Sequence, residues 1–186
     1  LAREALGGNR FQLILLTTFD ATSRIIAHQD MSIDTIVRQA AHLDIALVGV
    51  PMHRGSSDTY VSRVQQGLNL IERRYDSCRI DALVFGDLHL EHIKAWRNEH
   101  LGPLGYKMMY PLFKVPYDAL ETDLEASGVR CEVSSSRVDS VAVGQAYDAQ
   151  FRCGLNDAVD RLGENGEFHT VAQVWVVERA QALGLG

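Results

Sequence analysis

Two short segments of the chain concentrate residue types that could carry chemistry. The more distinctive one is Gly163-Glu-Asn-Gly-Glu-Phe-His-Thr170, in which two carboxylates surround an Asn-Gly pair and a histidine follows closely. Paired carboxylates beside a histidine can orient an ammonium ion, bind magnesium or act as a general base. Asn-Gly is also a strong hairpin signal, so a tight turn with solvated glutamates is the alternative interpretation.

The other segment runs from Phe85 to His92 and reads Phe-Gly-Asp-Leu-His-Leu-Glu-His. We expect Gly86 to allow close approach to the backbone, and Asp87 to bind magnesium or to cap a helix. The helix start that follows would attract anions through its free N–H groups. The alternative is a simple helix cap followed by surface histidines. Zinc is disfavoured, because the spacing of the two histidines and the glutamate matches neither common helical zinc motif.

The hydrophobic pattern predicts the elements that would position these segments. Nearly continuous apolar runs, typical of strands buried on both faces, occupy Phe11–Phe19, Ala46–Val50 and Ala82–Phe85. Helical periodicity follows each run and predicts three helices, the first capped by Ser32: Ile33–Leu43, Tyr60–Ile71 and His89–His100. Strands that alternate with helices indicate right-handed βαβ units and a parallel sheet.

Ligands of open parallel sheets bind beyond the carboxyl ends of the strands. The residues expected at those ends are Thr17 to Asp20, Pro51 to Arg54 and Gly86 to His89. From the first strand, we therefore predict that Thr17, Thr18, Phe19 and Asp20 contact a bound ligand.

The second half of the chain is less regular. We expect a helix from Tyr117 to Ser127 ended by Gly128, a strand from Val129 to Val133, a second helix from Phe151 to Leu162 and a strand from Thr170 to Val177. The serines at 134–136 are expected in a loop. The fold prediction is therefore an α/β protein with a Rossmann-like parallel sheet over residues 1–113 and a smaller α+β part over residues 114–186.

Composition limits the function classes. The 186 residues fit one domain, with 46% hydrophobic and 23% charged residues, as in ordinary globular proteins. A net charge of −6 argues against a broad nucleic-acid-binding surface, which needs clustered basic residues. The dispersed Cys78, Cys131 and Cys153 suggest reduced thiols in a cytoplasmic protein, and no apolar run is long enough to suggest a membrane segment.

Several motifs, taken in order, resemble the diphthine–ammonia ligase family, which belongs to the N-type ATP pyrophosphatases of the PP-loop (adenine nucleotide alpha hydrolase-like) superfamily. They are Val84-Phe-Gly-Asp87, the helix after it with Arg97, Pro111-Leu-Phe113 and, most specifically, the segment 163–170. The resemblance implies about five parallel strands that bind ATP. It also implies that the enzyme adenylylates a carboxylate, releases pyrophosphate and lets ammonia displace AMP.

The resemblance also implies roles for individual residues. Glu164, Glu167 and Asp87 would be catalytic, with Asp87 also holding Mg²⁺. ATP would contact the first strand's end and, in the second segment, Gly86, Asp87, His89 and Arg97. The acceptor or ammonium would contact Gly163, Glu164, Asn165, Gly166, Glu167, His169 and Thr170. His28 corresponds to a histidine that some members carry after the first strand.

The chain departs from the family in two ways. The defining S-G-G-x-D-S loop, which cradles pyrophosphate, is not in this sequence; we expect it upstream of Leu1–Leu6, a stretch of good helix formers that would be the tail of the helix after that loop. His169-Thr170 stands where many members carry another acidic residue, which suggests a bacterial branch with a different carboxylate acceptor. Alternatives are a non-catalytic adenine-nucleotide-binding module, or another PP-loop enzyme such as one that modifies tRNA. A homodimer is compatible with all three.

Overall fold

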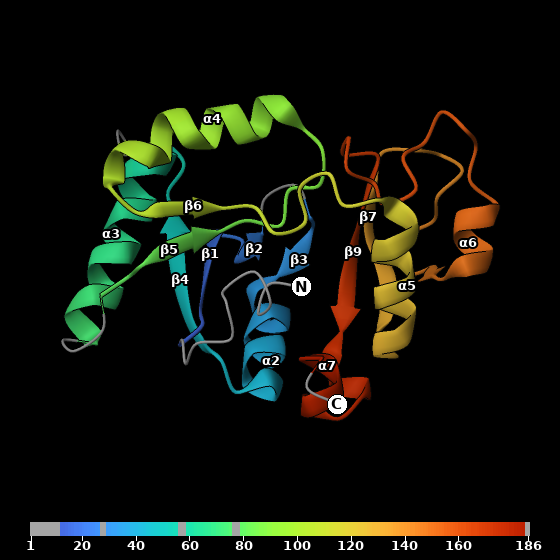
Figure 1. Cartoon of the computed structure of the whole chain (residues 1–186), viewed down its shortest axis with the longest axis horizontal. Coiled ribbons are helices and arrows are strands. Elements are labelled where there is room, and N and C mark those ends of the chain that lie inside the picture. Colours follow the sequence, from blue (N-terminus) through green and yellow to red (C-terminus); the bar gives the residue numbers. More distant parts are fainter. Residues whose placement is uncertain (1–11, 27–28, 56–58, 76–78, 185–186) are drawn as a thin grey trace.

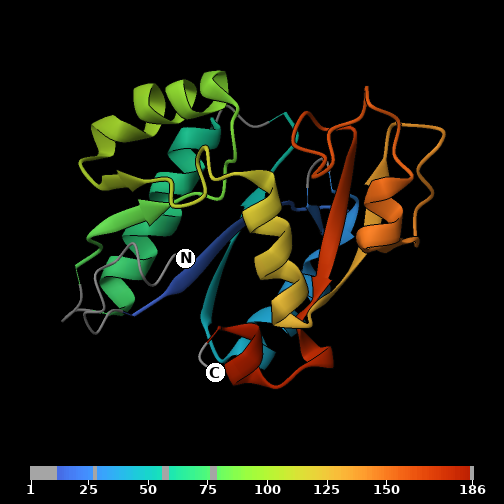
Figure 2. The ribbon, with the colours of Figure 1, turned by 45° about the vertical axis from the view of Figure 1, so that its right-hand side comes forward.

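The computed structural model describes residues 12–26, 29–55, 59–75 and 79–184 (Figure 1). The expected helix tail at Leu1–Leu6, together with His28 and Cys78, lies outside the described residues. The described chain is a mixed α/β structure. The parallel strands and the helices α3 and α4 form one side of the molecule, at the left of Figure 1. The antiparallel sheet and the helices α5 and α6 form the other side, which comes forward in Figure 2.

Four strands of the first half pair in parallel; the alternating pattern predicts three of them and the parallel pairing, whereas β6 was not predicted. β1 (Ile14–Asp20) pairs with β4 (Ala46–Met52) over seven residues, and β5 (Ala82–Val84) pairs with β6 (Lys107–Met109). A single sheet of about five strands is not confirmed, because these strands form two separate hydrogen-bonded pairs. Among the described residues, no strand bridges β1 and β5.

Both parallel pairs nevertheless face one apolar core. The helices that cover them are α3 (Tyr60–Arg74) and α4 (Glu91–Leu101). The core combines buried side chains of these helices with half-buried side chains from all four strands: Val64, Leu68, Ile71 and Leu101 with Ile14, Leu16, Val48, Leu83 and Met108. Shared burial therefore holds the two pairs in one layer where strand-to-strand hydrogen bonds do not.

The predicted helix α2 (Ile33–Leu43) begins as expected, because the Ser32 hydroxyl accepts a hydrogen bond from the Asp34 backbone N–H at 3.1 Å. The short β2 (Ile25–Ile26) and β3 (Met31–Ser32) pair in antiparallel fashion just before it. None of the described helices combines the length and apolar character that crossing a membrane requires.

The second half forms an antiparallel sheet in the order β8-β7-β9. Its strands are β7 (Arg130–Ser136), β8 (Ala146–Tyr147) and β9 (Phe168–Gln173). α5 (Tyr117–Ser127) ends at Gly128, which adopts φ 64°, as predicted. The chain closes with α7 (Arg179–Ala182), and single 3₁₀ turns occupy Gly102–Leu104 and Val174–Val176.

Three predictions for this half need correction. The strand expected over Thr170–Val177 is β9 over Phe168–Gln173, and Val174–Val176 form a 3₁₀ turn instead. The serines at 134–136 belong to β7 rather than to a loop: Ser135 and Ser136 pair with β9, and Ser134 lies at a register shift. The helix expected over Phe151–Leu162 is reduced to α6 (Ala149–Cys153), because Gly154 ends it and turns follow. Beyond the helix, the apolar Leu155, Val159 and Leu162 lie in turns and pack, partly buried, on the core that contains Val133 and Phe168. Their spacing is therefore similar to that of a helix without forming one.

The two halves meet along α2. The Gln39 side-chain amide donates to the Ala172 carbonyl at 2.8 Å, and the His42 ring contacts the Val177 carbonyl at 2.9 Å. The Arg38 guanidinium lies 3.8 Å from the centre of the Trp175 ring. The C-terminal strand is therefore anchored to the first half of the chain, while the boundary at residue 113 stays a prediction.

Gly67 offers a test of how tightly α3 packs on β1 and β4. A Cβ at Gly67 would lie 2.7 Å from a methyl of the buried Val50 and 3.2 Å from Leu16. Gly67→Ala gains about 1 kcal/mol of helix propensity but overpacks the interface, so we expect a net destabilisation of about 1 kcal/mol in urea unfolding. In a Val50→Ala background, which removes the 2.7 Å contact and leaves the 3.2 Å contact with Leu16, the same change should be clearly less destabilising. Stabilisation in both backgrounds would contradict this packing.

Candidate functional site

The corner after β5 is built around an ion pair. Both carboxylate oxygens of Asp87 accept hydrogen bonds from Arg97 on α4, at 2.7 and 3.0 Å. The side chains are 12% and 23% exposed, and the guanidinium lies 4.5 Å from the centre of the Phe85 ring. Burial lowers the pKa of Arg97, but hydrogen bonds and charge from Asp87 outweigh it and raise the pKa overall. Asp87 is therefore not a helix cap, a position that Leu90 occupies.

Gly86 faces open space in this corner. A Cβ built on Gly86 would meet no atom within 4 Å, so no side chain of the described residues fills the volume in front of its backbone. A nearby turn carries the motif Pro111-Leu-Phe113, and Lys94 of α4 lies 3.9 Å from the centre of the Phe113 ring. The corner is thus open in front of Gly86 and closed around the Asp87–Arg97 pair.

The acidic segment forms a tight loop before β9. The Gly166 N–H donates to the Gly163 carbonyl at 2.9 Å, and both glycines have positive φ, 82° and 69°. Phe168 is only 1% exposed, and its ring packs in the C-terminal core at 5.5 Å from Phe151. The hairpin interpretation is therefore half right: the turn exists, but its glutamates are not solvated.

Glu164 and Glu167 are half-buried and turned into the loop. Oε1 of Glu167 accepts hydrogen bonds from the Asp160 backbone N–H at 3.0 Å and from the Asn165 amide at 3.3 Å. Its Oε2 atom is buried and has no hydrogen-bond partner among the described residues. A buried carboxylate oxygen without a donor is costly, so this atom is a point where a bound donor would be favoured.

One hydrogen bond joins the loop to the corner. The Leu88 backbone N–H donates to Oε1 of Glu164 at 2.8 Å, although 76 residues separate them in the chain. The structure thus brings Gly86, Asp87, His89 and Arg97 together with the acidic loop.

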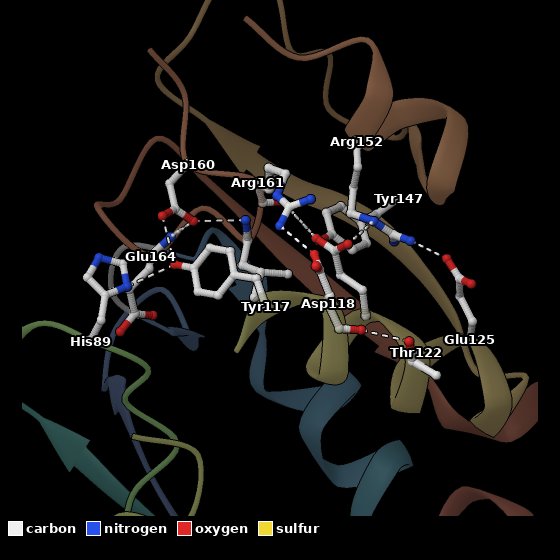
Figure 3. Close-up of polar contacts among 12 residues, drawn as sticks. His89, Tyr117, Asp118, Thr122, Glu125, Tyr147, Arg152, Asp160, Arg161 and Glu164 are labelled. Atoms are coloured by element: carbon white, nitrogen blue, oxygen red, sulfur yellow. Dashed lines mark hydrogen bonds and ion pairs between the residues drawn. The ribbon is translucent and has the colours of Figure 1, made fainter. Parts of the chain in front are cut away.

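Tyr117 and Asp160 complete this cluster and were not among the predicted residues. The Tyr117 hydroxyl lies 2.7 Å from Oδ2 of Asp160 and 2.8 Å from Nδ1 of His89 (Figure 3). Burial, followed by the hydrogen bond to Asp160, raises the pKa of Tyr117. The available signals were a tyrosine at a helix start directly after a proline and an acidic residue shortly before Gly163.

Ion pairs fix the helix that carries Tyr117. Arg152 of α6, with a side chain 6% exposed, contacts Glu121 and Glu125 of α5, the former at 3.7 Å. Arg161, next to Asp160, contacts Asp118 at 3.0 Å and Glu121 at 3.5 Å (Figure 3). These ion pairs lie along one face of α5 and therefore hold that face against α6 and against the segment that carries Arg161.

The end of β1 lies apart from these contacts. Thr17 to Asp20 are the last residues of the strand itself, not residues that follow it. Asp20 accepts hydrogen bonds from the Ser23 backbone N–H at 2.8 Å and from Arg54 at 2.9 Å. These hydrogen bonds lower the pKa of Asp20 to about 2. Its carboxylate is thus occupied by its own turn, and the ligand contacts of β1 stay a prediction.

A cavity of about 280 Å³ borders the far end of the loop. Its lining is Asp30, Ser135, Ser136, Arg137, Gly166, Glu167, Phe168 and His169. Thr170 follows within β9, opposite Val133. The loop therefore touches the corner at Glu164 and the cavity at Glu167 and His169.

The described residues contain no cluster of three side chains arranged to hold a metal ion. Mg²⁺ bound to nucleotide phosphates needs only one or two protein carboxylates, so a single aspartate could suffice. Each Asp87 oxygen accepts one hydrogen bond from Arg97 and keeps a second lone pair, and the magnesium role stays a prediction.

Gly163 tests the close packing of the loop. A Cβ there would lie 2.5 Å from the Phe168 carbonyl oxygen, whereas at Gly166 the nearest atom is 3.9 Å away. We expect Gly163→Ala to destabilise the fold by about 2 kcal/mol or more, and Gly166→Ala, with positive φ alone, by about 1 kcal/mol. Thermal and urea unfolding would measure both, and equal losses would mean that the loop is not packed as described.

Comparisons with known proteins add no family to this geometry. No known protein-family model matches the chain, and no curated protein shows significant sequence similarity to it.

Proposed function

We propose that this chain belongs to an ATP-dependent, amide-forming ligase, similar to diphthine–ammonia ligase, which adenylylates a carboxylate, releases pyrophosphate and uses ammonia. The hydrogen bond between the Leu88 N–H and Glu164 is the observation that carries the proposal. It joins a corner suited to a nucleotide to a loop suited to ammonium. Both halves of the reaction, carboxylate activation and amide formation, need those two places side by side. The dispersed cysteines support a cytoplasmic setting.

The corner supports the nucleotide side of the proposal. Gly86 leaves its backbone open to a phosphate, and Asp87 and Arg97 would hold the magnesium ion and the phosphate charge. When bound, ATP supplies AMP as a good leaving group for a carboxylate that is otherwise a poor acyl donor.

The loop supports the ammonia and acceptor side. Glu167 Oε2 lacks a hydrogen-bond donor, and an ammonium ion would provide one. The cavity at the end of the loop holds the cationic Arg137 beside His169, which suits a small carboxylate acceptor. The lining of this cavity includes none of the corner residues assigned to the nucleotide, so the acceptor is the better occupant.

The second candidate is a non-catalytic nucleotide-binding module. The Asp87–Arg97 ion pair favours it, because the guanidinium already balances the carboxylate charge that would attract magnesium. An S-G-G-x-D-S loop encoded upstream and pyrophosphate release from ATP would favour the ligase. Their joint absence would favour the module.

Glu164→Gln separates catalysis from structure. The glutamine can still accept from the Leu88 N–H, so the loop should stay in place while the negative charge is lost. We expect ATP binding to be nearly intact and pyrophosphate release to fall by about 10²-fold or more. Glu167→Gln should give a similar loss.

The matched control is Glu132→Gln on β7, where the carboxylate accepts from Gln173 at 3.1 Å. It removes the same charge away from the loop and should keep full turnover. Unchanged turnover in the Glu164 and Glu167 variants would support the plain-turn interpretation. Lost ATP binding in a folded variant would reverse the roles assigned to loop and corner.

Gly86→Ala tests the nucleotide position. The structure has room for the methyl group, so stability should change by less than about 1 kcal/mol, but the methyl would obstruct a phosphate. We expect ATP to bind about tenfold or more weakly, by calorimetric titration. Gly102→Ala, equally open but at the far end of α4, is the control. Equal ATP affinity in both variants would place the nucleotide elsewhere.

A further inference from the structure

The Tyr117 hydroxyl bridges two groups of the candidate site that lie far apart in the chain. It lies 2.7 Å from Oδ2 of Asp160 and 2.8 Å from Nδ1 of His89 (Figure 3). His89 follows Leu88, whose N–H contacts Glu164, so the imidazole stands beside the acidic loop. The three side chains form a continuous row of hydrogen bonds from the loop to the corner.

The number of available hydrogens determines which group donates and which accepts in each hydrogen bond of this row. Oδ1 of Asp160 accepts from the backbone N–H groups of Leu162 and Glu164, at 2.8 and 3.2 Å, and a carboxylate is an acceptor only. The single hydroxyl hydrogen of Tyr117 therefore goes to Oδ2 of Asp160. Because the tyrosine then has only acceptor capacity left, Nδ1 of His89 must be the donor. Burial and the nearby carboxylates keep the hydroxyl protonated by raising the pKa of Tyr117.

We infer that Asp160 and Tyr117 are positioning residues that hold His89 with its hydrogen on Nδ1, so that Nε2 is the proton acceptor for the nitrogen nucleophile. Nε2 points away from the tyrosine, on a half-buried ring, and has no hydrogen-bond partner among the described residues (Figure 3). This inference rests on the proposed ligase function and assigns its proton-transfer step.

The step balances as follows. Ammonium loses one proton to Nε2 of His89, which leaves ammonia with a free lone pair. The ammonia nitrogen forms a bond to the acyl carbon, and the bond from that carbon to the AMP oxygen breaks, with the electron pair leaving on AMP. The amide nitrogen then loses its second proton to solvent. The products are the amide, AMP and two protons, and no further reactant is needed.

Nitrogen NMR of the imidazole tests the tautomer without any turnover. In ¹⁵N-histidine-labelled protein, the His89 signals, identified by their loss in His89→Asn, should show a protonated Nδ1 and an unprotonated Nε2. Tyr117→Phe removes the acceptor for the Nδ1 hydrogen and should abolish that preference. Tyr106→Phe is the matched control, because its hydroxyl donates to Glu72 at 3.1 Å, away from His89, and should change nothing.

Asp160→Asn should invert the row with almost no change of shape. The two backbone donors at Oδ1 would keep the amide oxygen there, so the NH₂ group would face Tyr117. The tyrosine would then accept from Asn and donate to Nδ1 of His89, which moves the ring hydrogen to Nε2. The NMR signature should therefore reverse in this variant.

Turnover with two nucleophiles tests the role of Nε2. With ammonium, which has no lone pair until it loses a proton, Tyr117→Phe and Asp160→Asn should lower kcat by about 10²-fold while the Kd for ATP is unchanged. Hydroxylamine is uncharged at neutral pH and needs no such base, so its reaction should fall by less than about tenfold. Tyr106→Phe should keep both reactions.

Several results would overturn the inference. A wild-type ring with its hydrogen on Nε2 or on both nitrogens, or a signature that Tyr117→Phe and Asp160→Asn leave intact, would remove the tautomer assignment. Equal losses with ammonium and hydroxylamine would make the row purely structural. A wild-type protein with no turnover would end the catalytic role together with the proposed function, while the NMR result would still decide the tautomer.

Discussion

The hydrogen bond from the Leu88 N–H to Glu164 is the contact on which the arrangement of the site depends. It connects the end of a parallel strand with a loop of the antiparallel sheet, 76 residues away. The donor is a backbone N–H in the connection between β5 and α4, which lies outside both elements. The contact therefore pairs the Glu164 carboxylate with a backbone donor rather than with a basic side chain.

The site accommodates four acidic side chains by giving each a different donor. Asp87 has the guanidinium of Arg97, Asp160 has a tyrosine and two backbone N–H groups, and the two glutamates of the loop have backbone or amide donors. A half-buried carboxylate that has no donor is costly, so this distribution permits a dense acidic site in an acidic protein. The exception is Oε2 of Glu167, which makes it the natural place for a bound cation or amine.

Local features of the fold could be predicted from sequence, and long-range ones could not. Ser32 caps α2 and Gly128 ends α5 as predicted, because caps depend on residues within one helical turn. The division into two parallel pairs and the placement of the serines in β7 depend on pairing across the chain, which local periodicity does not report. Tyr117 and Asp160 were missed for the same reason, since their role comes from a contact across 43 residues.

The motif 163–170 contains residues proposed for chemistry and residues that only hold the loop in place. This limits which substitutions can test the proposed chemistry. Phe168 is buried in the C-terminal core, and successive residues of an extended segment point to opposite sides, so its burial turns Glu167 and His169 away from that core. The orientation of the chemical groups thus depends on a side chain that takes no part in chemistry. Truncating Phe168 would lose about 1.5–3 kcal/mol of burial and displace both neighbours together. Only substitutions that preserve the shape of the side chain, such as carboxylate to amide, can therefore test the chemical role of the loop without changing its conformation.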